Sequence, residues 1–157
     1  MVKISKNSTF HPVIIIDIGA NRGQSIERFK KIFVNPIIHS FEPVKSEFDF
    51  MYKKFKNDKN IFLNNFALED KKEDKLLNVS LNTGNSSFNK INKDTAWIKI
   101  KSKKHNTSPQ DYVFESQIVA VDTLDNYYIY NKINKIHLLK IDTEGYADNV
   151  LIGSSNS

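Results

Sequence analysis

Cysteine is absent from this chain of 157 residues. Its absence excludes a disulfide framework, a thiolate nucleophile and a zinc site built on cysteine. Long apolar runs are lacking as well, and the run at 13–16 near the amino end is far too short for a signal peptide or a membrane span. We therefore expect a cytoplasmic protein with no membrane span. The four histidines lack metal-ligand spacing, so we also expect no metal site: His11, His39, His105 and His137.

Acidic residues are in the minority, because 18 Asp and Glu stand against 23 Lys and Arg, for a net charge of +5. A basic chain can indicate a nucleic-acid partner. The lysines are scattered, however, and their densest run, at 99–104, is typical of a solvated surface. No platform of interleaved aromatic and basic residues is present for RNA. We expect no nucleic-acid partner, and an RNA methylase stays as an alternative only.

The most informative stretch is residues 13–23, which read VIIIDIGANRG. Its apolar run without alternation predicts a strand buried on both faces, and Gly19 and Gly23 predict a tight turn before a helix. The alternative is a buried strand that ends in an ordinary turn. A strand, a glycine turn and a helix form the nucleotide-binding corner of an open α/β sheet. The spacing D-x-G-x-x-x-G departs from the dinucleotide fingerprint, and the carboxylate of Asp17 suits an ammonium group better than a pyrophosphate. The motif therefore favours S-adenosylmethionine (SAM) over NAD.

The remainder of the first half alternates between helices and strands. Hydrophobic spacing predicts helices over 24–33 and 46–55, and strands over 37–41 and 61–68. The second helix carries a stripe that we interpret as core: Phe48, Met51, Tyr52 and Phe55. Strand, helix, strand, helix, strand is one half of a doubly wound α/β sheet, so we predict a Rossmann-like fold.

The second half departs from this regular alternation. Segments 76–81 and 117–121 are predicted to pair as antiparallel strands, with the polar stretch 82–115 as a mobile or lid-like loop between them. Asp122 is predicted to cap a short helix that ends at Tyr130. A fourth buried strand is then expected over 136–141, followed by a helix over 146–152.

Six short motifs in order make the chain resemble the FkbM family of SAM-dependent methyltransferases. They are DIGANRG at 17–23, SFEP at 40–43, NFAL at 65–68, SSF at 86–88, VDTLD at 121–125 and LLKIDTEG at 138–145. The resemblance covers roughly residues 13–153. It implies a Rossmann-like methyltransferase fold that binds SAM and methylates a hydroxyl group of a saccharide or another small natural product.

The resemblance also implies further strands after the fourth one, so we expect a fold that is incomplete at the C-terminus. We divide the chain into a lead-in (1–12), the methyltransferase domain (13–153, with the insertion 82–115) and a tail (154–157). An open edge on the fourth strand would favour self-association. A catalytically inactive fragment that only binds the cofactor or a partner is therefore the main alternative function.

Cofactor-binding residues are expected at the ends of the first three strands. Asp17 would hold the methionine end, and Glu42, 19 residues after Gly23, would bond the ribose hydroxyls. The alternative for Glu42 is a helix cap at the surface, and Asn65 and Ala67 could flank the adenine or merely pack. The full predicted set is Asp17, Gly19, Ala20, Asn21, Gly23, Glu42, Asn65 and Ala67.

Asp142 and Glu144 follow the fourth predicted strand, beside the expected position of the methyl group. A hydroxyl acceptor benefits from a general base, and a carboxylate within hydrogen-bond reach can serve. We predict Asp142 and Glu144 as the catalytic residues. Two alternatives remain open: Asp142 could cap the following helix, and the two carboxylates could hold a divalent ion, although no third ligand is identifiable.

Overall fold

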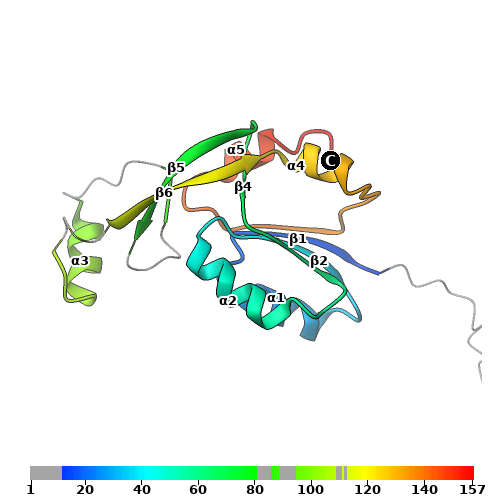
Figure 1. Cartoon of the computed structure of the whole chain (residues 1–157), viewed down its shortest axis with the longest axis horizontal. Coiled ribbons are helices and arrows are strands. Elements are labelled where there is room, and N and C mark those ends of the chain that lie inside the picture. The colour runs from blue at the N-terminus through cyan, green and yellow to red at the C-terminus, as the bar shows by residue number, and fades with distance from the viewer. Residues whose placement is uncertain (1–11, 81–85, 89–94, 109–110, 112) are drawn as a thin grey trace, which may run out of the picture.

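In the computed structural model of the chain, the described residues are 12–80, 86–88, 95–108, 111 and 113–157 (Figure 1). Their secondary structure alternates at first and then becomes irregular, as the sequence predicted. The elements are β1 (Ile14–Ile18), α1 (Gln24–Ile32), β2 (Ile37–Phe41), α2 (Lys45–Phe55), β3 (Ile61–Asn64), β4 (Ala67–Leu68), β5 (Glu73–Ser80), α3 (Ala96–Lys104), β6 (Val113–Asp122), α4 (Leu124–Tyr130), β7 (Leu138–Ile141) and α5 (Ala147–Ile152).

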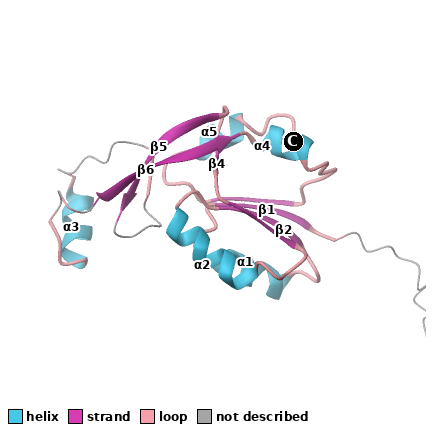
Figure 2. Ribbon diagram, in the orientation of Figure 1, coloured by secondary structure: helices cyan, strands magenta, loops and turns pink. Residues whose placement is uncertain are grey.

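The main sheet has the strand order β3-β2-β1-β7, and all of its neighbouring strands run parallel. Helices α1 and α2 cover one face, and α4 and α5 lie on the other (Figures 1 and 2). Strand β1 is buried on both faces because Ile15 packs toward α1 and α2, whereas Ile16 packs toward α4 and α5. This arrangement confirms the predicted Rossmann-like α/β fold.

The third predicted strand, 61–68, is divided between two sheets. Strand β3 pairs with β2 in the main sheet, whereas β4 pairs with β6 in a second sheet of order β4-β6-β5. The break falls at Asn65, whose side-chain amide donates to the carbonyl oxygens of Glu42 (2.8 Å) and Pro43 (3.2 Å). These bonds tie the chain to the end of β2 while its backbone turns toward the second sheet.

The antiparallel pair in the second half is confirmed, with longer strands than predicted. Strand β5 pairs with β6 from Glu73 opposite Val121 to Ser80 opposite Val113. The predicted loop 82–115 is wrong in part, because it contains α3 and the first residues of β6. Thr95 begins α3, since its hydroxyl accepts a hydrogen bond from the backbone N–H of Ile98. Positions 81–85, 89–94, 109–110 and 112 lie outside the described residues.

Two of the predicted helices differ from the structure in detail. The N-cap of α4 is Thr123, whose hydroxyl accepts from the N–H of Asn126, while Asp122 accepts from the N–H of Thr123. The stripe of α2 is only partly core, because Met51 is fully buried but Tyr52 is 47% exposed. A helix flanking a sheet buries a narrow face, and Tyr52 lies beyond that face.

Strand β7 pairs with β1, as predicted for the fourth strand, and begins at Leu138 rather than at 136. Among the described residues it is the edge strand of the main sheet, and its side chains are only half-buried. The self-association expected from such an edge stays a prediction. Within the described part of the chain, every helix is too short or too polar to cross a bilayer.

Candidate active site

The turn after β1 brings the chain against the ends of β2 and β7. Gly19 has φ +74°, and a Cβ atom there would lie 2.1 Å from the carbonyl oxygen of Asp142. The backbone N–H groups of Gly19 and Ala20 both donate to the carbonyl of Phe41, at 3.0 Å each. Glycine at position 19 is therefore required by the close approach of three strand ends, in addition to its positive φ.

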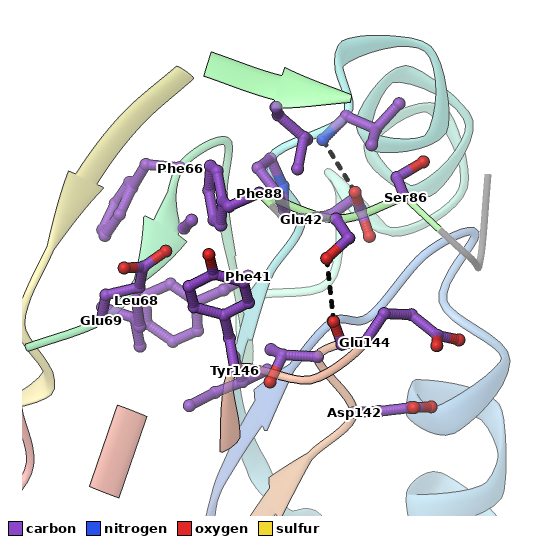
Figure 3. Close-up of a pocket in the computed structure, with 18 of the residues that line it drawn as sticks. Phe41, Glu42, Phe66, Leu68, Glu69, Ser86, Phe88, Asp142, Glu144 and Tyr146 are labelled. Atoms are coloured by element: carbon purple, nitrogen blue, oxygen red, sulfur yellow. Dashed lines mark hydrogen bonds between the residues drawn. The ribbon is translucent and has the colours of Figure 1, made fainter. Parts of the chain in front are cut away.

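A pocket opens at the carboxyl ends of β1, β2 and β7, between the main sheet and the second sheet (Figure 3). The empty space in and around its mouth, open solvent included, amounts to about 740 Å³. Its aromatic and aliphatic walls include Phe41, Phe66, Leu68, Leu77, Phe88 and Tyr146. The carboxyl ends of the strands are where an open parallel sheet binds its ligand.

Most of the predicted site residues surround this pocket. Its lining includes Gly19, Asn21, Glu42, Ala67, Asp142 and Glu144. Four predicted residues lie outside the lining: Asp17, Ala20, Gly23 and Asn65. Gly23 instead starts α1 in a left-handed conformation beside the ring of Phe55. Asn65 acts from behind the wall, by fixing the backbone of Glu42 and Pro43.

Asp17 is fully buried below the turn, and its carboxylate faces other residues of the chain. Its Oδ2 accepts a hydrogen bond from the Ser25 hydroxyl at 2.5 Å, and its Oδ1 lies 3.1 Å from the Lys140 ammonium. The latter contact is an ion pair by distance, although it lacks hydrogen-bond geometry. The cation that we predicted the ligand would offer to Asp17 is thus supplied by Lys140.

Glu42 lies at the end of β2 with only 5% of its surface exposed. Its Oε2 accepts from the backbone N–H of Asn21, and its Oε1 from the N–H of Val44, both at 2.8 Å. Burial raises the pKa of Glu42 to about 7, against the opposing effect of these two hydrogen bonds. The carboxylate therefore joins the turn after β1 to the start of α2 while it also faces the pocket.

Asp142 and Glu144 follow β7 on the opposite side of the pocket from Glu69 (Figure 3). The Asp142 side chain is 73% exposed, and its Oδ2 lies 3.7 Å from Lys140 Nζ. Helix α5 begins after Tyr146 without a side-chain cap, so Asp142 does not cap it. Partial burial, and then the nearby Asp142 charge, raise the pKa of Glu144. The Ser87 hydroxyl donates to the Glu144 carbonyl at 2.9 Å and holds the segment 86–88 over the pocket.

Three charged residues of this region were missed by sequence reasoning. Lys140 joins the two strands because its ammonium donates to the carbonyl of Gly19 at 2.8 Å and pairs with Asp17. Glu69 lines the pocket after β4 and pairs with Lys75 on β5 at 2.6 Å. The parallel pairing of β1 with β7 places Lys140 beside Asp17, so this ion pair was predictable from the strand order. Glu69 and Lys75 come together only through the second sheet, which the sequence did not predict in full.

The pocket has the general features of a cofactor site. Apolar walls with a few polar groups are typical of such sites. Glu42 offers a carboxylate for hydroxyl donors, and the turn at Gly19 brings backbone to the pocket edge. Among the described residues, no group of three or more His, Asp or Glu is arranged to hold a metal ion. The divalent-ion alternative for Asp142 and Glu144 therefore gains no support.

Comparison with known families gives one match, to the methyltransferase FkbM domain, over residues 17–157. Comparisons with curated proteins and with solved structures gave no match. The matched range contains every element from the glycine turn to α5 and all of the residues that line the pocket. Together with the parallel sheet and the pocket at its carboxyl edge, this match identifies the chain as a member of the FkbM methyltransferase family, enzymes of the SAM-dependent kind.

Proposed function

We propose that this pocket binds SAM and that the enzyme transfers its methyl group to a hydroxyl of a saccharide or another small natural product. The observation that carries the proposal is the convergence of Gly19, Asn21, Glu42, Asp142 and Glu144 on one pocket. These residues come from three strand ends, and each of them lies in one of the sequence motifs at 17–23, 40–43 and 138–145. Their convergence supports one ligand site.

Each end of the cofactor has a matching part of the pocket wall. Glu42 is assigned to the ribose hydroxyls, because its buried carboxylate faces the pocket beside Pro43 and Val44. The methionine end is assigned to the turn at Gly19 and Asn21, beside Asp142. Asp17 serves this end indirectly, since it holds Lys140, which in turn bonds the Gly19 carbonyl.

When bound, SAM supplies an electrophilic methyl group on a positively charged sulfur. The residues of the chain must then position the acceptor hydroxyl in line with that methyl group and remove the hydroxyl proton. Glu144 is assigned as the general base, because its raised pKa brings its basicity closer to neutral pH. Asp142 raises that pKa and adds negative charge beside the reacting centre.

The charge around the pocket supports a neutral acceptor. Lys75 and Lys140 are each paired with a buried carboxylate, and Asp142 and Glu144 add two further acid groups to the pocket wall. Such a wall repels phosphorylated or carboxylated acceptors and favours neutral, hydroxyl-rich ones.

The test combines a binding measurement with a transfer assay on the full chain. Isothermal calorimetry should detect binding of SAM and of its demethylated product S-adenosylhomocysteine, with NAD as the negative control. Transfer of a labelled methyl group to a panel of neutral sugars and small alcohols should then identify the acceptor class. If NAD binds more tightly than SAM, the cofactor assignment is wrong. If SAM binds but no acceptor is methylated, the alternative of an inactive cofactor-binding chain is favoured.

A further inference from the structure

Glu69 lines the pocket, and one of its carboxylate oxygens has no hydrogen-bond partner among the described residues. Only 1% of the Glu69 surface is exposed, and the residue lines the pocket. Its Oε2 accepts a hydrogen bond from the Lys75 ammonium at 2.6 Å, but its buried Oε1 has no such partner. A buried oxygen of this kind costs stability unless a donor reaches it. The arrangement therefore points to a ligand that brings an N–H or O–H group to Oε1.

Lys75 fixes the orientation of this carboxylate. Its ammonium lies 4.8 Å from the ring centroid of Phe88 and 4.7 Å from that of Tyr146, so two cation–π contacts hold it in addition to Glu69. Burial raises the pKa of Glu69, and the hydrogen bond and charge of Lys75 oppose that shift. With Oε2 engaged by Lys75, Oε1 is the oxygen left for a ligand.

The position of Glu69 indicates which part of the ligand would reach it. In Figure 3, Glu69 lies on the opposite side of the pocket from Asp142, with Phe41 and Tyr146 between them. If the methionine end lies at Gly19 and Asp142 and the ribose at Glu42, the base of the nucleoside extends toward Glu69. The side chains around this part of the pocket, including Phe41, Phe66 and Leu68, are aromatic or aliphatic and suit a flat ring.

We propose that Glu69 recognises the base of the cofactor, and that its Oε1 accepts a hydrogen bond from the 6-amino group of the purine. This inference rests on the proposed function. Lys75 is the positioning residue, because it holds Oε2 and leaves Oε1 facing the ring. Neither residue belongs to the motifs that the sequence analysis assigned to the cofactor.

The proposal has a chemical consequence that plain packing would not have. An ionised carboxylate can only accept hydrogen bonds. It can therefore accept a hydrogen bond from the amino group of a 6-amino purine. A 6-oxo purine places a second acceptor against it, so Glu69 Oε1 and the 6-oxo oxygen both lack a donor. The pocket should discriminate against the 6-oxo base, and an amide at position 69 should remove the discrimination, since an amide can also donate.

The experiment measures the binding of two ligands that differ only at this position of the base. Calorimetry on the full chain gives the dissociation constants of S-adenosylhomocysteine and of its 6-oxo counterpart, S-inosylhomocysteine. In the wild type we expect the 6-oxo ligand to bind about 10- to 100-fold more weakly, as expected for the loss of a hydrogen bond to a charged group. In Glu69→Gln this ratio should fall to within about threefold.

The matched control is Asp70→Asn, the same type of change at the next residue, which is exposed and outside the lining. This control should keep the wild-type ratio. Thermal melting of all three proteins establishes that each variant is folded. Lys75→Met is a second variant, expected to weaken binding of the 6-amino ligand because Glu69 then loses the ammonium that keeps it charged and oriented.

The outcomes separate this inference from the proposed function. If the wild type binds both ligands equally, or if Glu69→Gln keeps the wild-type ratio, Glu69 does not recognise the base although the cofactor site stands. If the wild type binds neither ligand, the proposed function fails and the inference fails with it. A ratio that collapses in Glu69→Gln and persists in Asp70→Asn supports the assignment.

Discussion

The ammonium of Lys140 on β7 lies 3.1 Å from Oδ1 of Asp17 on β1, where the parallel register places the two residues side by side. The same ammonium donates to the carbonyl of Gly19 at 2.8 Å. A single cation thus connects a fully buried carboxylate to the backbone of the turn that borders the pocket. This contact joins β7, which precedes the proposed catalytic residues, to the turn that we propose to bind the cofactor.

Removal of this cation should destabilise the protein. In Lys140→Met, Asp17 would keep a buried charge without its ion-pair partner, and we expect a loss of about 3 kcal/mol in the free energy of unfolding. Urea denaturation measures this loss. Lys135→Met, at an exposed lysine that precedes β7, is the control and should change the stability by less than about 0.5 kcal/mol.

The double variant Asp17→Asn, Lys140→Met tests the cause. Because it also removes the uncompensated charge, it should recover part of the stability lost in Lys140→Met. If the effects of Asp17→Asn and Lys140→Met simply add, the double variant will be less stable than Lys140→Met. That result would show that Lys140 does not stabilise the protein through its ion pair with Asp17.

We predict that replacing Gly19 by alanine lowers the unfolding free energy by more than its positive φ alone explains. Gly145 has a similar positive φ, +86° against +74° at Gly19. Gly145→Ala should therefore cost the penalty of a left-handed backbone, about 1–2 kcal/mol. Gly19→Ala adds the contact of its Cβ with the Asp142 carbonyl at 2.1 Å, so its loss in unfolding free energy should be at least twice as large. Equal losses in the two variants would contradict the steric argument.

The sequence predicted the parts of this protein that depend on local pattern and on the order of strands. The apolar run ending at Asp17 and the glycine turn identified β1, and parallel order alone placed Glu42 and Asp142 at one edge of the sheet. The break at Asn65 was not predictable, because it depends on hydrogen bonds to a distant strand end. The role of Glu69 was not predictable either, because its ion pair with Lys75 depends on the formation of the second sheet.

The raised pKa of Glu42 makes the stability of the ligand-free protein depend on pH. The ordinary pKa of this group is 4.5, and burial raises it to about 7 in the folded chain. Between these values the folded state holds a proton that the unfolded state has lost, so this contribution to stability is present at low pH and is lost as the pH rises to about 7. The loss is on the order of 3 kcal/mol.

Glu42→Gln should be free of this loss because its side chain does not titrate. Urea denaturation at about pH 4.5 and about pH 8 gives the unfolding free energy of both proteins. From the lower to the higher pH, the stability of Glu42→Gln relative to the wild type should increase by roughly 3 kcal/mol. His39, whose pKa burial lowers to about 4, opposes this trend but is common to both proteins. A difference that does not change with pH would show that Glu42 is ionised in the folded protein throughout this range.

The proposed general base predicts how the methyl-transfer rate responds to changes at Glu144 and Asp142. Glu144→Gln should lower kcat by about 10²- to 10⁴-fold, because the acceptor proton then has no carboxylate to receive it. The dissociation constant of S-adenosylhomocysteine should change little. Asp148→Asn, in the first turn of α5 and outside the pocket lining, is the control and should leave both quantities unchanged.

The pH profile assigns the roles of the two carboxylates. In the wild type the rate should rise with pH as Glu144 loses its proton, with a midpoint above the ordinary 4.5 of a glutamate because burial and Asp142 raise its pKa. Asp142→Asn removes one of these two causes, so the midpoint should move to lower pH while the maximal rate falls less than in Glu144→Gln. If Asp142→Asn instead abolishes the rate and Glu144→Gln keeps a wild-type profile, Asp142 is the base and Glu144 the residue that acts on it.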